Sequence, residues 1–352
     1  MKKTFVSLAL IFGMLSSANA EYRIIQTDKP GGGGSVWTST VLRQLNKFMD
    51  EPIVMEHIPG ARNIPGANKF QKEYRFDNKY LLTTVGSNST NLLMEKTDYN
   101  FADWDAIGGQ NLDMIVGRSV KFDGSQKLVW GNTAGLVDST GMALMICGNL
   151  ENMDAYLKCW NEKAKYVSGV SSADQKLSFL RGEFNVTRDS PAAWNKNYSK
   201  NTDVTIWYSN GIWDSKNAKQ IPNPNFNDKH FFVNVFKDKW GVEPKGEMYD
   251  VYSLLIPANN AMQKVIWVNK GNPNTKKIRE AFKRMLADKE SMAQLDKDLG
   301  GSYGWFVGDE MNKVYNQVFS NVTEVQLKNI TKWYTNALKA DSLYKPEMIT
   351  KK

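Results

Sequence analysis

A run of four glycines followed by a serine is the first feature of the chain that could do chemistry. Gly31–Gly34 and Ser35 come directly after the short apolar run Tyr22–Ile25. A loop without side chains lets backbone N–H groups approach a ligand closely. A helix that starts near Ser35 adds free N–H groups and the positive end of its dipole, which favour a carboxylate or a phosphate. Gly33 and Gly34 would offer amides, although a bare glycine run is also compatible with a flexible turn.

Two further loops carry groups that suit an oxygen anion. The loop at 57–67 contains Asn63 and follows a predicted strand at Ile53–Met55. The loop at 86–91 follows a predicted strand at 79–85 and has hydroxyl and amide side chains in a row: Ser87, Asn88, Ser89 and Thr90. Such groups donate hydrogen bonds to oxygen anions. Capping of a helix would account for one or two of them, but not readily for four.

The pattern of strand, polar glycine loop and helix returns about a hundred residues later. We expect a strand at 127–131, a loop at 132–141 that contains Ser139 and Thr140, and a helix at 142–149. This recurrence predicts a second α/β domain that presents its own helix N-terminus. Asp189, at the tip of a later strand, either accepts a hydrogen bond from a ligand or caps the strand end. Trp37 either covers the ligand or anchors the core.

The elements that position these residues are short buried strands and amphipathic helices. Apolar residues at helical spacing predict helices at 38–49, 276–288 and 324–340. Strand-like runs also occur at 114–116, 164–172, 254–257 and 265–268. The segment 194–247 is rich in Asn, Lys, Pro and aromatic residues, and we place only a strand at 204–208 within it.

The first twenty residues have the composition of a secretory signal peptide. Lys2 and Lys3 precede an apolar core at 5–15, and small residues end the segment at Ala20. We therefore predict cleavage after Ala20 and export of a soluble chain into a periplasm. Loss of the two lysines reduces the formal charge from +8 to +6. Because the basic residues are scattered among acidic ones and not clustered, this charge suits small anions and does not indicate nucleic-acid binding.

Cysteine and histidine usage limits the possible chemistry. Cys147 and Cys159 are the two cysteines, and an oxidising compartment permits them to form a disulfide; a pair of buried thiols is the alternative. His57 and His230 are the only histidines, and neither has ligand spacing from the cysteines. We predict no metal site and no cofactor.

No catalytic constellation is recognisable. Two histidines leave little room for His-dependent acid–base chemistry, and no Gly-x-Ser-x-Gly elbow surrounds Ser139. The glycine run has neither the Walker nor the dinucleotide-binding spacing. We therefore expect a binding protein and assign no catalytic residue.

The three loops of the first half, in this order, resemble those of the periplasmic receptors of tripartite tricarboxylate transporters, the Bug family. The resemblance is carried by Pro30–Ser35, by Pro59–Gly66 and by Gly86–Thr90, and more faintly by Ser139–Gly141 and Tyr166–Gly169. The chain departs from the family at Ser35-Val36-Trp37, where an Asp is usual, and in the long polar segment 194–247.

The resemblance implies an α/β protein with the two-domain type 2 periplasmic binding protein fold and a ligand cleft between the domains. Residues 21–121 and 256–352 would form domain 1, and residues 122–255 domain 2. The ligand would be a small organic carboxylate, held by amides and hydroxyls and delivered by a monomeric receptor to integral-membrane transporter subunits. The alternatives are another anionic or sugar-derived solute and a periplasmic hydrolase. The residues expected to bind the ligand are Gly33, Gly34, Ser35, Trp37, Asn63, Ser87, Asn88, Ser89, Thr90, Ser139, Thr140 and Asp189.

Overall fold

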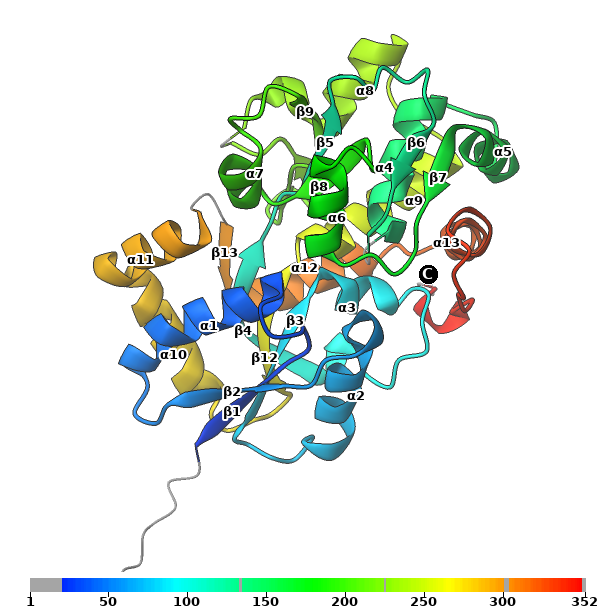
Figure 1. The fold of residues 1–352 in the computed structure, drawn as a ribbon. Coiled ribbons are helices and arrows are strands. Elements are labelled where there is room, and N and C mark those ends of the chain that lie inside the picture. Colours follow the sequence, from blue (N-terminus) through cyan, green and yellow to red (C-terminus); the bar gives the residue numbers. More distant parts are fainter. Residues whose placement is uncertain (1–20, 133–134, 225, 301–303, 350–352) are drawn as a thin grey trace, which may run out of the picture.

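A computed structural model describes residues 21–132, 135–224, 226–300 and 304–349 (Figure 1). The predicted signal peptide and its cleavage site after Ala20 lie outside these residues. In the described part, no helix has the length and apolar character needed to cross a membrane.

The first unit is built on a six-stranded mixed sheet with the strand order β13-β4-β12-β3-β1-β2. β1 pairs in parallel with β2 and β3, whereas β12 is antiparallel to both β3 and β4, and β13 is antiparallel to β4. Its strands are β1 (Tyr22–Gln26), β2 (Ile53–His57), β3 (Tyr80–Val85), β4 (Trp104–Asn111), β12 (Lys264–Asn269) and β13 (Gly304–Val307).

Helices cover both faces of this sheet, so that neighbouring strand residues point into two different cores. Ile24 packs with α1 (Gly33–Leu45), α10 (Thr275–Ala287) and α11 (Lys289–Leu299) on one face. Ile25 packs on the other face, which α2 (Ile64–Glu73) and α12 (Asp309–Phe319) cover. A sheet buried on both faces needs near-continuous apolar strands, which is the pattern seen in the sequence.

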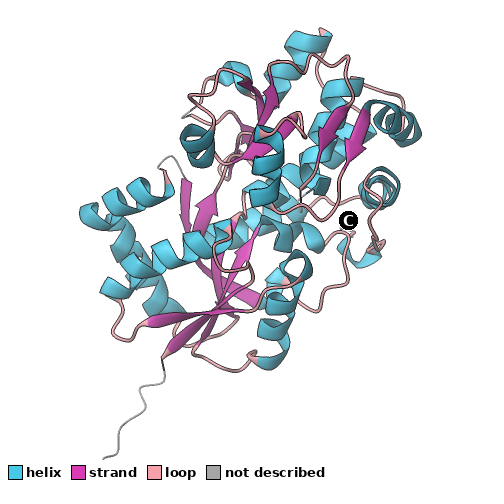
Figure 2. Ribbon diagram, viewed as in Figure 1, coloured by secondary structure: helices cyan, strands magenta, loops and turns pink. Residues whose placement is uncertain are grey.

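The second unit contains a three-stranded and a two-stranded sheet, besides a hairpin described below (Figure 2). β5 (Ile115–Ser119) lies between β8 (Val186–Asp189) and β9 (Val204–Ser209), antiparallel to both, and β6 (Leu128–Trp130) pairs in parallel with β7 (Ala164–Tyr166). Asn185 connects these two sheets, because its N–H donates to Val129 O at 3.1 Å and its Oδ1 accepts from Val129 N at 2.9 Å. The helices of this unit are α4 (Gly135–Cys147), α5 (Met153–Lys163), α6 (Ser172–Leu180), α7 (Pro191–Asn197) and α8 (Phe232–Trp240).

Three expected elements differ from those observed. The polar stretch at 86–91, expected to be a loop, is the helix α3 (Gly86–Asn91). The apolar run at 254–257 is not a strand but part of α9 (Glu247–Asn260), and Pro257 lies inside this helix. α4 already includes Gly135, so the predicted loop up to residue 141 is wrong. α4 and α9 are buried almost all round, and a helix of that kind lacks the periodic polar face by which a sequence identifies it.

The polar segment 194–247 is structured along most of its length. After β9, the chain forms a hairpin of β10 (Ile212–Asp214) and β11 (Lys219–Ile221), the short helix η4 (Asp228–His230) and then α8. The Trp213 indole donates to Gln317 Oε1 of α12 at 3.2 Å, and Asn111 Nδ2 donates to Trp213 O at 2.8 Å. The hairpin therefore rests on the first unit at the end of β4.

The chain passes from the first sheet to the second between Asn111 and Ile115, and it returns through α9 to β12. After α12, the last helix α13 (Glu324–Ala337) packs against α5 of the second unit and against α9. The domain boundaries predicted near residues 121 and 255 stay a prediction. The remaining elements are α3 (Gly86–Asn91), η1 (Asn46–Phe48), η2 (Ala61–Asn63), η3 (Phe101–Asp103) and η5 (Pro346–Met348).

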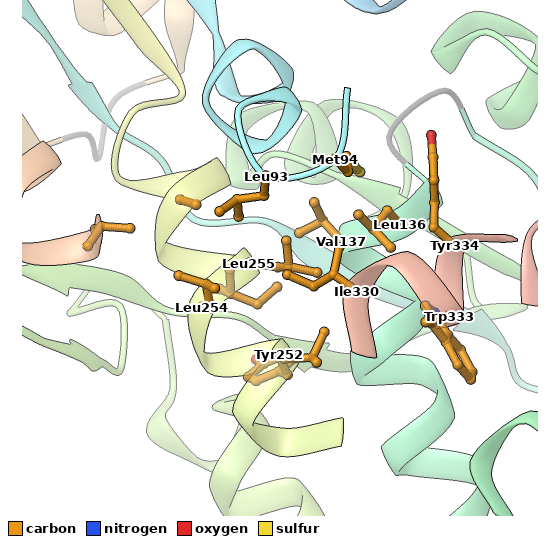
Figure 3. Packing of buried hydrophobic residues seen from close by; sticks show 14 of the residues in the cluster. Leu93, Met94, Leu136, Val137, Tyr252, Leu254, Leu255, Ile330, Trp333 and Tyr334 are labelled. Atoms are coloured by element: carbon orange, nitrogen blue, oxygen red, sulfur yellow. The ribbon is translucent and has the colours of Figure 1, made fainter. Parts of the chain in front are cut away.

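Apolar side chains from both units meet in one continuous core. Figure 3 shows Leu93 and Met94, which follow α3, beside Leu136 and Val137 of α4. Side chains of α9 and α13 complete the contact, among them Leu255. The two units are therefore in contact through this shared core.

The predicted disulfide is present. Cys147, the last residue of α4, is bonded to Cys159 of α5, and their Cα atoms lie 6.2 Å apart. The bond ties together the two helices that flank the β6–β7 pair.

Candidate functional site

The glycine loop surrounds a carboxylate of the protein itself. Asp28 Oδ2 accepts from the Gly34 N–H at 2.9 Å, and Asp28 Oδ1 accepts from the Lys29 N–H at 3.0 Å. A Cβ atom built on Gly32 would lie 2.5 Å from Asp28 Oδ2, so glycine is required for this close approach. The Gly34 amide that was expected to bind a ligand is thus already engaged by Asp28, whereas Gly33 is exposed at the start of α1.

Ser35 and Trp37 point into the first unit. Ser35 is 5% exposed, and its Oγ lies 2.9 Å from His57 Nε2 at the end of β2. Trp37 is 4% exposed and donates from its indole nitrogen to Gln110 Oε1 at 2.5 Å. It also packs against Trp305, with ring centroids 6.2 Å apart. Trp37 therefore has the position of a core anchor on the buried face of α1.

The second and third loops are joined to each other. Asn63 has a left-handed backbone with φ 65°, and its Nδ2 donates to Ser87 Oγ at 3.0 Å. Asn88 Nδ2 donates to Asn63 O at 2.8 Å, and Asn88 Oδ1 accepts from Val85 N at 3.0 Å. Ser87 is half-buried, whereas Asn88 is fully buried. Ser87 is the least enclosed of the four polar residues Ser87–Thr90, which belong to the helix α3.

Ser89 and Thr90 satisfy their hydroxyls within the protein. Ser89 Oγ donates to Gly86 O at 2.8 Å and is also in contact with Ala258 O of α9. Thr90 Oγ1 donates to Ser87 O at 3.2 Å. These residues hold α3 against α9 at the border between the two units.

Ser139 and Thr140 lie inside α4 and are both fully buried. Each hydroxyl donates to a carbonyl one turn earlier at 2.8 Å, Ser139 to Leu136 O and Thr140 to Val137 O. Ser139 Oγ also accepts from the Trp333 indole at 2.9 Å. The expectation that these residues start a helix is wrong, because α4 begins before them.

Asp189 is the last residue of β8 and is half-buried. Its carboxylate accepts from Ser190 N at 3.0 Å and from Asn197 Nδ2 at 3.4 Å. Burial raises the pKa of Asp189, and these hydrogen bonds oppose that shift. The contacts are those of a strand-end cap.

Sequence reasoning missed a buried ion pair in the second unit. Arg188 Nε lies 2.9 Å from Asp138 Oδ2, and the two side chains are 10% and 0% exposed. Burial raises the pKa of Asp138 to about 6, and the neighbouring Arg188 cation opposes the shift. The available signal in the sequence was Arg188, a charged residue within a short strand. Its partner Asp138 lies fifty positions earlier in the chain, so the pair could not be predicted.

Sequence reasoning also missed a lysine at the junction of the units. Lys264 begins β12, where its register partners are Val85 at the end of β3 and Gln110 of β4. Its Nζ donates to Gln263 Oε1 at 3.4 Å, and the same oxygen accepts from Gly86 N at 3.2 Å.

The charges around Lys264 come from both units. The pKa of Lys264 is lowered to about 8, chiefly by burial. The Asp28 carboxylate opposes this shift, and the Arg188 cation adds to it. Lys264 is therefore within electrostatic range of the glycine loop on one side and of β8 on the other. We call the start of β12 around Lys264 the junction.

A second contact between the units lies beside the Asn63 loop. The Arg62 guanidinium is paired with Glu95 and lies 4.5 Å from the ring centroid of Tyr334 in α13. A cation over an aromatic face is worth about 0.5–1 kcal/mol at an exposed site and more when it is desolvated. This contact joins the first unit to the helix that packs on the second.

The described residues contain no group of three or more His, Cys, Asp or Glu side chains that could hold a metal ion. Two open hollows lie on the outer faces of α12 and α13, and neither is lined by a predicted site residue.

No protein-family model and no curated protein sequence matches the chain. Solved structures do match it. BugD, a periplasmic binding protein, has a TM-score of 0.55 at 12% identity, over 90% of this chain and 96% of that one. MatC from Rhodopseudomonas palustris with bound malate has a TM-score of 0.53 at 11% identity, over 90% of this chain and 98% of that one. Rpa4515 of R. palustris with adipate has a TM-score of 0.55 at 9% identity, over 90% and 96%. The predicted two-domain α/β fold of periplasmic binding proteins is confirmed.

Proposed function

We propose that the protein is a Bug-type periplasmic solute receptor that captures a small organic carboxylate between its two units. The single observation that carries the proposal is the fold of two units, because structures similar in fold hold malate and adipate. Lys264 of β12 and Arg188 of β8 supply basic groups from the two units.

Capture would proceed by closure of the two units around the ligand. Two connections, at 111–115 and at 260–264, join the sheets and would act as the hinge. Arg62 and Tyr334 would meet when the units close, as they do here. Gly33, Ser87 and Asn63 would present amide and hydroxyl groups from the first unit to the ligand.

A receptor fits these residues better than the hydrolase alternative does. A nucleophilic serine must reach its substrate and needs a base within hydrogen-bond reach. Ser139, the candidate nucleophile, is fully buried and is bonded to Leu136 O and to the Trp333 indole. We therefore propose a protein without catalytic activity.

The same proposal covers location and partners. The leader-like segment at 1–20 supports export, and the fold supports a periplasmic protein that delivers its ligand to integral-membrane transporter subunits. We propose that the receptor acts as a monomer, which sedimentation of the purified protein tests.

Ligand-dependent stabilisation tests the function. Thermal unfolding would be followed with a panel that begins with malate and adipate and extends to tricarboxylates, amino acids, sugar acids and sugar phosphates. A ligand at a hundredfold excess over its dissociation constant should stabilise the protein by about 2.7 kcal/mol. Stabilisation by sugar phosphates alone would transfer the assignment to another anionic solute. The absence of any shift would overturn the proposal.

A further inference from the structure

One stretch of the polar segment 194–247 is bonded to the chain where it passes between the two units. We call this stretch, residues 209–223, the hairpin segment, because it contains β10 and β11. Asp113, in the connection at 111–115, is 1% exposed. Its carboxylate accepts hydrogen bonds from three groups of the hairpin segment: Ser209 Oγ at 2.6 Å, Gly211 N at 2.9 Å and Asn223 Nδ2 at 3.1 Å. A buried carboxylate is costly unless donors surround it, so these bonds fix the connection to the hairpin segment.

The residues on either side of Asp113 are bonded to the same segment. Asn111 is 2% exposed; its Nδ2 donates to Trp213 O at 2.8 Å, and its Oδ1 accepts from Trp213 N at 3.3 Å. Met114 O accepts from Asn210 N at 3.0 Å. The side-chain amide of Asn111 thus pairs with the hairpin as a neighbouring strand would. The hairpin segment therefore follows the connection along most of its length.

The hairpin segment is also attached to the first unit through α12. Gln317 Oε1 accepts from the Trp213 indole at 3.2 Å, and Gln317 Nε2 donates to Ser215 O at 2.8 Å. Trp213 is 9% exposed, so the contact is largely closed to water. One glutamine side chain therefore holds two successive turns of hydrogen bonding between the hairpin and α12.

The start of the hairpin requires a glycine for this close packing. Gly211 has φ 76°, and a Cβ atom built on it would lie 2.2 Å from Ile221 O. Gln220 Nε2 donates to Asn210 O at 2.8 Å and closes the base of the hairpin. The Tyr252 hydroxyl of α9 donates to Asn210 Oδ1 at 3.0 Å. The hairpin is thereby tied to the helix through which the chain returns to the first unit.

Rotation of the units about their connections would break some of these bonds. The hairpin segment continues from β9 of the second unit, whereas Asn111 and Gln317 belong to elements of the first. The two connections are also joined to each other, because Leu112 N donates to Asn260 O at 3.0 Å. A buried group that loses its partner is left unsatisfied, so each of these bonds opposes the rotation.

We infer that the hairpin segment restrains the hinge and holds the two units of the ligand-free protein in the arrangement described here. It must release the first unit, at Gln317 and Asn111, before the units can rotate apart. The inference goes beyond the proposed function, because it concerns the protein without ligand. It gives a role to the polar segment by which the sequence departs from the Bug family.

Amide hydrogen exchange and small-angle X-ray scattering of the ligand-free protein test the restraint. Overlapping peptides that cover 110–115 and 209–215 would be followed by mass spectrometry. Gln317→Ala removes both bonds from α12 to the hairpin. The amides of Leu112 and Trp213 should then exchange about tenfold faster, and the radius of gyration should increase. Asn316→Ala, at an exposed neighbour on the same helix, is the matched control and should leave both measurements unchanged.

The Leu112 amide distinguishes a restrained hinge from a merely local contact, because its partner is Asn260 in the second connection and not the hairpin. Faster exchange at Trp213 alone would mean that only the hairpin loosens, and it would overturn the inference. An unchanged radius of gyration in Gln317→Ala would overturn it too. The result does not depend on whether malate, adipate or any other ligand binds, so it is separate from the test of the proposed function.

A second variant tests the other end of the hairpin segment. Ser209→Ala removes one of the three donors to Asp113 and is far in sequence from the peptide at 110–115. It should also accelerate exchange at Leu112 by about tenfold and increase the radius of gyration, as expected for loss of one hydrogen bond to a charged group. Exchange at Leu112 that stays at the wild-type rate in this variant would contradict the inference.

Discussion

Arg188 Nε lies 2.9 Å from Asp138 Oδ2 in a part of the second unit where both side chains are almost fully enclosed. The pair connects β8 to α4. The buried charge of Arg188 is therefore balanced by a buried acid.

Loss of the arginine should be costly, because it would leave the Asp138 carboxylate buried without a counter-ion. Arg188→Met should lower the free energy of unfolding by about 3 kcal/mol at neutral pH. Urea unfolding followed by tryptophan fluorescence measures this change. Addition of Asp138→Asn should recover part of the loss, since the double variant has no buried charge at this position. If the two single costs simply add, the pair does not interact.

The pH dependence of stability should also report Asp138. Its pKa in the folded protein, about 6, is above the ordinary value of 3.8, so the folded state holds its proton more tightly than the unfolded state does. This group therefore makes the protein less stable as the pH rises from about 4 to about 6. The difference in unfolding free energy between Asp138→Asn and the wild type should shift in favour of the variant over this window, by about 1 to 3 kcal/mol. Urea titrations at several pH values measure it, and a flat difference curve would contradict the prediction.

Two neighbouring glycines provide a matched test of the loop. Gly34→Ala should destabilise the protein by about 1 to 3 kcal/mol, because the added methyl would lie 2.8 Å from Val85 Cγ1. Gly33→Ala meets no atom within 4 Å and should be neutral or slightly stabilising. Thermal unfolding of the two variants side by side separates crowding from the general effect of removing a glycine. Equal stability of the two would show that the Gly34 contact is not needed.

The disulfide should contribute to stability by restricting the unfolded chain. Cys147 and Cys159 are 12 positions apart, and closing a loop of this length is worth about 3 kcal/mol. The double variant Cys147→Ser, Cys159→Ser should show this loss in urea unfolding. A reducing agent should lower the stability of the wild type and leave the variant unaffected. A response of the variant to the reductant would indicate an effect unrelated to this bond.

Affinity for a carboxylate should fall at alkaline pH. Lys264 has a pKa of about 8 in this structure, lowered from 10.5 chiefly by burial, with Asp28 and Arg188 as the charged neighbours. Below about pH 8 the side chain is protonated and attracts a carboxylate; above it, the charge is progressively lost. Binding should weaken by up to about tenfold per pH unit above 8, since one proton is required. Titration calorimetry between pH 6 and 9.5 measures the slope, which Lys264→Met should abolish.

Lys264 also affects the stability of the free protein in a defined direction. Its folded pKa is below the unfolded value, so the unfolded chain binds more protons between about pH 8 and 10.5. The stability contributed by this group should therefore rise over that range. Urea unfolding of the wild type and of Lys264→Met over this pH range measures the slope of stability. Its sign should be opposite to that of the slope of affinity.

Much of the first unit could be read from the sequence. Its strands are short apolar runs that end at glycine or at polar loops, and an element of this kind is specified by neighbouring residues alone. The glycine loop and the Asn63 loop follow strands, as predicted, whereas the expected third loop at 86–91 is the helix α3. The disulfide was also predicted correctly, because the two cysteines are close in sequence and leave a single pairing.

The second unit could not be read in the same way. α4 and α9 are buried almost all round, so their sequences have no polar face, and Ser139 was placed at a helix start that lies earlier in the chain. Only the tertiary structure brings Arg188 to Asp138, which lies fifty positions earlier in the chain. Local pattern determines which segments form strands and loops, because backbone preferences act between neighbours. Which charges face one another is decided by sheet order and by the contact between the units, because these bring distant residues to the same edge.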